Sequence, residues 1–292
     1  MVRRARRPLW QRLPPAVKWS GFAFLFLGLL GGIFVLVQWL AAPRGEETLA
    51  QDAEIQSEIL VVEEDQPLDA IVRRTVEAMG GFAALSDLTS LRKRGTLWQG
   101  EQPFAVDYHF KEPALLRYRL QVGNNAMVLS HNGEIAWRLV ELNRVVQPWQ
   151  PLSPTERVLM QRNAEMSRPV SVYLEQTPSL TKLPDVVVEA HPCFVIAFDD
   201  SQEARQVFYI DKTDYLIRKR ERLDRSESTP DRLLEVIYRD YREVDGLQIA
   251  FEEHVFVNGA EDNRFVMTAV EVNPGVLSSY FNPPPAAPVD AP

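Results

Sequence analysis

An unbroken apolar run near the N-terminus constrains this chain more than any other feature. Residues 21–37 read GFAFLFLGLLGGIFVLV and contain no polar side chain. With the residues that follow, the run reaches the about 20 residues that an α-helix needs to cross the hydrocarbon core of a bilayer. Trp19 and Trp39 flank it, as interfacial aromatic residues do. The sequence therefore predicts one transmembrane helix over residues 20–42.

Charge is divided unevenly on the two sides of this helix. Residues 1–42 hold six of the 32 basic residues and no acidic one, which leaves 26 basic against 40 acidic residues, a net charge of −14, for the remainder. Because basic flanks stay on the cytoplasmic side, we expect residues 1–19 in the cytoplasm and the body across the membrane. In a bacterium that places the body in the periplasm. An acidic body also argues against a nucleic-acid partner, which requires a basic face.

A cleaved signal peptide is the alternative interpretation of the apolar run. The run exceeds the ~7–15 residues usual for a signal peptide, and the small pair Ala41 and Ala42 is followed directly by Pro43. We favour the retained anchor. The single cysteine, Cys193, lies far from the run, which excludes a lipid-anchored lipoprotein as well as a disulfide framework.

The rest of the chain divides by composition. Residues 43–66 form an acidic linker, because eight acidic and no basic residues lie between 46 and 65 and like charges keep a segment extended. Residues 67–283 are expected to fold as one domain. The proline-rich tail, residues 284–292, is expected to be disordered.

Two helices are predicted within the domain. Apolar residues recur at helical spacing from Leu68 to Met79, and Gly80–Gly81 end the pattern, followed by a short turn into the strands. Ser153, Pro154 and Glu156 form a capping box that begins a helix running to about Met166.

Strands dominate the remainder of the domain. In residues 104–110 and 116–120 apolar and polar residues alternate, the pattern of a sheet with one buried face. Further strands are expected at 135–139, 186–189, 193–198, 204–210, 216–223, 233–241, 248–257 and 264–271. The fold class is therefore mainly β with helices: a strongly curved antiparallel sheet, or unclosed β-barrel, of about 10–11 strands covered by helices.

Several short motifs resemble one known family. The strand entry 111–118 (KEPALLRY) resembles the Lys-x-Pro entry of the LolA/LolB-like periplasmic lipoprotein carrier superfamily, and 132–137 (NGEIAW) resembles its Asp-Gly-Lys-x-x-Trp hairpin. Residues 208–217 and 240–247, with the late Asn273-Pro274, resemble later strands, especially those of outer-membrane lipoprotein-sorting-like proteins. The resemblance covers about residues 67–283.

The resemblance implies an unclosed barrel whose hollow holds acyl chains. Candidate lipid-binding residues that would line it are Trp98, Phe104, Tyr108, Tyr118 and Trp137. The alternative is that these side chains are ordinary core, since any such sheet needs an apolar face. One position departs from the family: Glu112 stands where the carriers have an arginine that latches the helical lid, so a latch of the same kind is in doubt.

No catalytic residue, metal site or cofactor is predicted. The four histidines, His109, His131, His191 and His254, are far apart and are interpreted as solvated. Asp211 and Asp214 are assigned to Asx turns, and Cys193 to a small hydrophobic role. The basic run 218–222 is interpreted as a solvated strand face.

Two hypotheses follow from these features. The first is a non-catalytic lipid- or lipoprotein-binding module anchored in the bacterial inner membrane. The second is a membrane-anchored interaction or regulatory scaffold that uses the same fold without lipid cargo and binds a periplasmic or inner-membrane protein. An enzyme ranks third, because no motif that carries catalysis is found.

Overall fold

The structure is a computed structural model, and it describes residues 66–167, 180–201, 204–224 and 231–285. The chain divides into two compact units, Met1–Glu63 and Glu64–Pro292, and all that follows concerns the second. The predicted transmembrane helix, residues 20–42, and the basic tip lie outside the described residues, as does nearly all of the acidic linker. Within the described ranges, no helix has the length and apolarity that crossing a bilayer requires.

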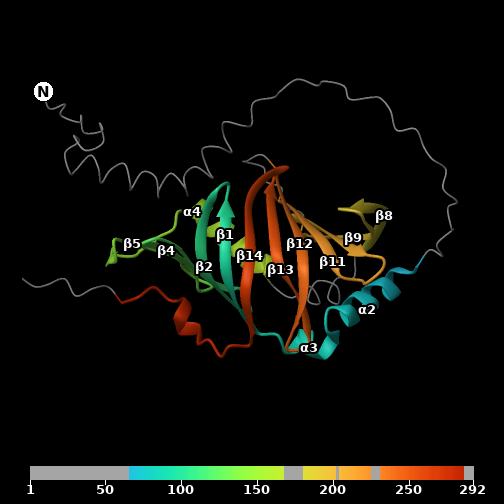
Figure 1. Ribbon diagram of the computed structural model, residues 1–292, viewed down its shortest axis with the longest axis horizontal. Coiled ribbons are helices and arrows are strands. Elements are labelled where there is room, and N and C mark those ends of the chain that lie inside the picture. Colours follow the sequence, from blue (N-terminus) through green and yellow to red (C-terminus); the bar gives the residue numbers. More distant parts are fainter. Residues whose placement is uncertain (1–65, 168–179, 202–203, 225–230, 286–292) are drawn as a thin grey trace, which may run out of the picture. The chain divides into compact units, whose positions relative to one another are not determined.

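A single curved antiparallel sheet forms the body of this unit (Figure 1). Its strand order is β6-β5-β4-β3-β2-β1-β14-β13-β12-β11-β10-β9-β8, with β7 paired to β5. The strands are β1 (Ser90–Gln99), β2 (Gln102–Lys111), β3 (Leu115–Val122), β4 (Asn125–His131), β5 (Ala136–Leu142), β6 (Val145–Val146), β7 (Gln150–Pro151), β8 (Thr181–Val188), β9 (His191–Ser201), β10 (Ala204–Asp211), β11 (Ile217–Asp224), β12 (Arg232–Val244), β13 (Leu247–Val257) and β14 (Ala260–Val272). Because β6 and β8 do not pair with each other, the sheet stays unclosed, as predicted.

The sheet has more strands than the 10–11 expected from the sequence. Strands β6 and β7 are two residues each, too short to produce a pattern. Strand β4 is buried on both faces along nearly its whole length, so its sequence does not alternate. In β1 the alternation is masked because Lys93 and Gly95 occupy positions on the same face as Leu91 and Leu97.

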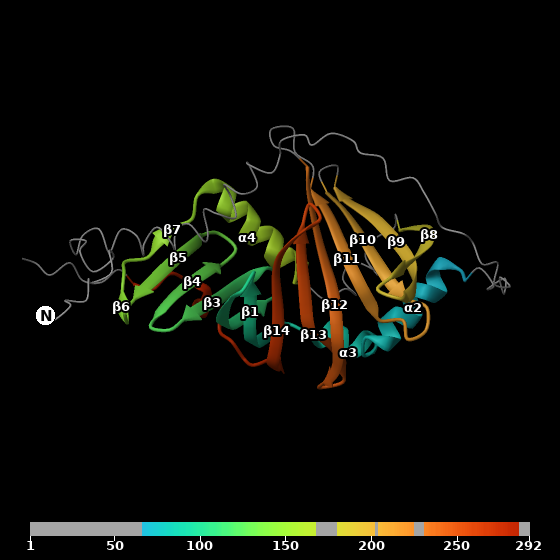
Figure 2. The same ribbon diagram turned by 45° about the horizontal axis from the view of Figure 1, so that its top comes forward.

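In the described part of the chain, three α-helices accompany the sheet (Figure 2), and one 3-10 helix follows its last strand in sequence. They are α2 (Leu68–Ala78), α3 (Gly81–Asp87), α4 (Pro154–Met166) and η2 (Ser278–Phe281). Helix α4 begins and ends as predicted, and both bonds of its capping box, between Ser153 and Glu156, are present. The short turn expected after Gly80 is instead the helix α3, because the chain continues helically once the left-handed Gly80 (φ 125°) has redirected it.

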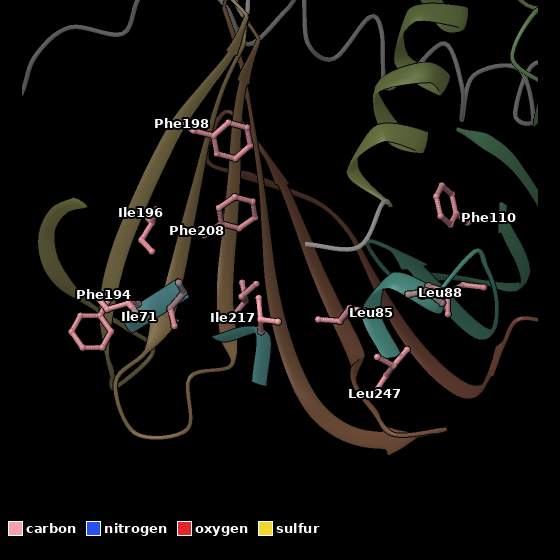
Figure 3. Packing of buried hydrophobic residues seen from close by; sticks show 13 residues of the cluster. Ile71, Leu85, Leu88, Phe110, Phe194, Ile196, Phe198, Phe208, Ile217 and Leu247 are labelled. Atoms are coloured by element: carbon pink, nitrogen blue, oxygen red, sulfur yellow. The ribbon is translucent and has the colours of Figure 1, made fainter. Parts of the chain in front are cut away.

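Helices α2 and α3 pack on one face of the sheet through the main hydrophobic cluster (Figure 3). Ile71 of α2 and Leu85 of α3 join Phe208 of β10 and Leu247 of β13 in this cluster. We call the face that α2, α3 and α4 cover the inner face, and its opposite the outer face. The inner face is therefore where the core of the domain lies.

The outer face of β2–β5 carries a different cover, the C-terminal segment 273–282. The Nε1 of Trp137 and the Oγ of Ser130 both donate to the carbonyl of Phe281, each at 2.9 Å. Arg117 stacks over the rings of both Trp137 and Tyr280. The C-terminal segment is thus an integral part of the domain, and the two faces of the sheet are covered by different parts of the chain.

Candidate functional site

Three of the five residues predicted to line the hollow share the inner face. Tyr108 of β2 lies directly opposite Tyr118 of β3, and Phe104 lies two pleats away from Tyr108 on the same strand. Side chains two positions apart point to the same face of a sheet, so these three are grouped as predicted. Their contact with lipid stays a prediction.

The other two residues, Trp98 and Trp137, lie on the outer face. Trp137 lies opposite Ser130, whereas Tyr118 lies opposite Leu129, so the two aromatic residues are one position out of step. Trp98 is likewise one position beyond Leu97, which lies opposite the inward-facing Phe104. A one-residue offset moves a side chain to the opposite face. Trp137 is fully buried beneath the C-terminal segment, where it supports the fold rather than the hollow.

An apolar floor occupies the middle of the inner face. A second hydrophobic cluster joins Val106 of β2 to Phe251 of β13 and to Phe265 and Met267 of β14. Leu97, Leu120 and Tyr108 pack against it and are only partly buried. This floor lies on strands that are neighbours in the sheet but far apart in the sequence, so no local sequence signal could have grouped its residues.

A polar pair interrupts this apolar face. The Nζ of Lys93 lies 2.6 Å from the Oε1 of Glu253, and it also lies over the ring of Tyr108. The hydroxyl of Tyr108 is hydrogen-bonded to Ser167, the residue that ends α4, and burial raises the pKa of the Tyr108 phenol. An ion pair at such a site contributes little net stability, because both charges lose solvation.

The C-terminal end of α4 is held by arginines from β11. Arg220 donates to Gln206 and to the carbonyl of Met166, the latter at 2.8 Å. Arg222 lies 3.3 Å from Glu165 and donates to Asp224 at 2.7 Å. The expectation of a solvated strand face for residues 218–222 is wrong at these two positions, since Arg220 and Arg222 are buried. Their charge gave no indication of burial because their partners lie on other elements.

The N-terminal half of α4 is attached to the other arm of the sheet. Its buried residues, Met160 and Ala164, lie on a helix that contacts β3, β4 and β5. Arg138 of β5 lies 3.5 Å from Glu156 in the first turn. Helix α4 therefore bridges two arms of the sheet, and five strands lie between β3 and β11 in the strand order.

Glu112 lies in the turn between β2 and β3. Its backbone N–H donates to Thr89 at 2.8 Å, and its peptide bond to Pro113 is cis. The neighbouring Lys111 donates to the carbonyl of Val276 in the C-terminal segment. Arg220 and Arg222 on β11 contact the end of α4, and this strand is far in sequence from Glu112.

The histidines are less exposed than predicted. His109, His131 and His254 are buried, so the expectation of solvated side chains is wrong for them. His191 is exposed, as predicted, and its Nδ1 lies 2.7 Å from Asp211. Within the described part of the chain, no group of three His, Cys, Asp or Glu side chains is arranged to hold a metal ion.

The remaining sequence assignments agree with the structure. Asp211 and Asp214 accept from the backbone N–H of Thr213 and Leu216, the geometry of Asx turns. Cys193 is fully buried, and burial raises the pKa of its thiol to about 11. The thiol therefore packs as a small apolar group.

No protein-family model and no curated protein matches the chain. Among solved structures, it is similar to an outer membrane lipoprotein-sorting protein domain from Vibrio parahaemolyticus, with 14% identity, a TM-score of 0.42, and coverage of 74% of this chain and 95% of that one. A LolA superfamily protein from Nitrosomonas europaea matches at 12% identity and a TM-score of 0.43, covering 74% and 97%. The Pseudomonas aeruginosa MucA/MucB complex matches with 11% identity and a TM-score of 0.21, and the match covers 71% of this chain and 94% of that one.

Two of these structures are named for the group of proteins that the short sequence motifs resemble. At these identities and TM-scores the likeness concerns the fold and says nothing of cargo or partner.

Proposed function

We propose that this protein is a non-catalytic lipid- or lipoprotein-binding module whose inner face receives acyl chains. In this proposal residues 20–42 anchor it in a bacterial inner membrane, residues 1–19 lie in the cytoplasm, and the domain lies in the periplasm. The proposed topology is supported by the sequence, through the apolar run and the basic residues that precede it.

The observation that carries the proposal is the contrast between the floor of the inner face and its cover. The floor, formed by Val106, Phe251, Phe265 and Met267, is apolar. The end of α4 above it is held by the polar contacts of Arg220, Arg222 and Tyr108. Polar contacts can be exchanged for water when a cover moves away, whereas an apolar floor gains by contact with an acyl chain.

A matched pair of variants on β1 tests the proposal. Leu97 lies on the inner face beside the floor, and Thr96 lies next to it on the opposite face. Native mass spectrometry of the full chain with a short-chain diacyl lipid is expected to show one lipid retained. Leu97→Gln should weaken retention about tenfold, and Thr96→Gln should leave it unchanged. Equal retention by both variants, or none by the natural protein, would contradict an inner-face site.

A second candidate function is supported by the β8 edge of the sheet, which has no neighbouring strand among the described residues. Strand β8 ends the strand order, and its Val186 and Val187 are 42% and 69% exposed. An exposed edge with apolar side chains favours the addition of an extended partner segment. This is the interaction scaffold that binds a periplasmic or inner-membrane protein.

A photo-crosslinking amino acid at Val187 distinguishes this candidate from lipid binding. The scaffold predicts a protein adduct in cells from position 187 but not from Val158, which is 40% exposed on α4. Adducts of equal yield from both positions, or from neither, would rule out the β8 edge as a specific docking site.

A further inference from the structure

We propose that Arg162 and Arg232 bind the anionic phosphate of a phospholipid head group at one end of the inner face. The inference rests on the proposed function, because it gives an orientation to a lipid whose acyl chains lie on the apolar floor. Two observations support it. One end of the inner face is closed by apolar packing and the other carries charged side chains, and the two guanidinium groups lie close to one buried carboxylate.

The end of the inner face beside the β12–β13 turn is closed. Leu247 is buried in the main cluster with Leu85 and Leu88, and α3 contacts β13 there. The helices also approach the turn closely, since a Cβ placed on Gly80 would lie 2.5 Å from the carbonyl oxygen of Gly246. This end therefore presents apolar groups and close backbone packing.

The opposite end lies at the other end of β12, whose 13 residues span roughly 40 Å. Here β11 ends at Asp224 and β12 begins at Arg232. A cluster of charged side chains gathers around Asp224: Arg222 donates to its Oδ1, and Arg162 from α4 and Arg232 lie 3.2 and 3.8 Å from its Oδ2. The two ends of the inner face thus differ sharply in polarity.

Within this cluster the carboxylate is buried, whereas two of the arginines are partly exposed to solvent. The Asp224 side chain is 2% exposed, whereas those of Arg162 and Arg232 are 24% and 28% exposed. Asp262 also interacts electrostatically with Arg232, and burial lowers the pKa of the Arg232 guanidinium. The surface that a ligand meets at this end is therefore formed by guanidinium groups above a buried carboxylate.

The hydrogen bonding of these groups is incomplete. Among the residues that the structure describes, Asp224 Oδ2 and Arg232 Nη1 are buried atoms with no hydrogen-bond partner, and Arg162 lies within ion-pair distance of the same Asp224 oxygen. Each guanidinium carries five N–H donors, more than one shared carboxylate oxygen can accept. An unpaired buried donor is costly, so a further acceptor at this place would be favourable.

A phosphodiester supplies that acceptor. Its oxygens match the planar donor fork of arginine, and two guanidinium groups on different elements can share one phosphate. With the phosphate at this end, the acyl chains of the same molecule extend along the apolar floor of β13 and β14 toward the closed end. A neutral acyl lipid would cover the apolar floor but would give the two arginines no additional hydrogen-bond acceptor.

The test compares head groups on identical chains. Native mass spectrometry of the full chain is performed with dioctanoyl phosphatidylglycerol and with dioctanoylglycerol, which has the same acyl chains and no phosphate. Phosphatidylglycerol is expected to bind about tenfold more tightly. The double variant Arg162→Gln, Arg232→Gln should remove that preference and leave dioctanoylglycerol binding unchanged. Arg157→Gln, an exposed arginine on the same helix, is the control and should change neither.

The outcomes separate this inference from the proposed function. If the natural protein binds both lipids equally, or if the double variant keeps the preference, the head-group site is wrong while acyl binding stands. If neither lipid binds, the proposed function itself fails. Displacement of phosphatidylglycerol by millimolar inorganic phosphate would instead assign a free-phosphate site. Should the double variant unfold, Arg162→Gln alone is expected to lower the preference, and an unchanged preference would overturn the proposal.

Discussion

The two helical covers of the inner face are attached by different chemistry. Helices α2 and α3 are held by apolar side chains, among them Ile71 and Leu85, within the main cluster. Helix α4 buries Met160 and Ala164 against one arm, but its C-terminal end is held on the other arm by hydrogen bonds and ion pairs. The comparison indicates that α2 and α3 are permanent parts of the core, whereas α4 can detach at one end without exposing a large apolar area.

The largest expected effect comes from weakening the permanent cover. Phe208 is fully buried, and its ring stacks on Phe198 at 5.7 Å between centroids. Phe208→Ala should lower the free energy of unfolding by about 3–5 kcal/mol, because it removes a large buried side chain and leaves a cavity. Denaturant unfolding of the full chain measures this change, with the exposed Val158→Ala as the control. A loss below about 1 kcal/mol would mean that this cluster does not hold the fold.

A smaller and local effect is expected at the polar attachment. Arg220→Met removes the bonds to Gln206 and to the Met166 carbonyl, at a cost of about 2 kcal/mol for hydrogen bonds to a charged group. Hydrogen exchange should rise in residues 154–167 while that of 68–78 stays unchanged. Equal increases in both helices would show that the two covers form one cooperative unit, against the comparison drawn here.

The capping box offers a third test, at the opposite end of α4. Ser153→Ala removes the side chain that accepts from the N–H of Glu156, which should cost about 1 kcal/mol. Exchange should then rise mainly in the first turn, near β5. If the C-terminal turn opens equally, the two ends of α4 are not independent.

The smallest expected effect concerns the cover of the outer face and depends on pH. Burial lowers the pKa of His109, which packs against the Tyr280 ring at 4.9 Å, although Asp107 opposes the shift. Because the folded state then binds fewer protons than the unfolded state, stability falls as pH drops through the unfolded pKa of about 6.5. His109→Phe should flatten the pH dependence of thermal unfolding between about pH 7 and 5. An unchanged slope would exclude His109 as its source.

Features with a local cause were predictable from the sequence. The capping box predicted where α4 begins, because its hydrogen bonds join residues that are three positions apart in the sequence. Period-two alternation placed β2 and β3 and grouped Phe104, Tyr108 and Tyr118. The short motifs that resemble the LolA/LolB-like superfamily are also local, since each describes a turn and the strand beside it.

Features that depend on distant partners were not predictable. Trp137 was predicted to line the hollow because a buried aromatic residue is compatible with either face of the sheet. Only its pairing with Ser130 shows that it lies on the outer face. Arg220 was expected in solvent because its acceptors belong to β10 and to the end of α4. Strand β4 gave no alternation because neighbouring parts of the chain cover both of its faces.

The central claim, an acyl chain on the inner face, is tested most directly by mapping a photoactivatable phospholipid. The full chain is reconstituted in nanodiscs that contain a diazirine-labelled acyl lipid, irradiated, and digested for mass spectrometry. The account predicts adducts within residues 247–272, at inner-face positions such as Phe251, Phe265 and Met267, with none at outer-face positions such as Trp137. Labelling of residues 20–42 and of outer-face positions, with none at the floor, would contradict it.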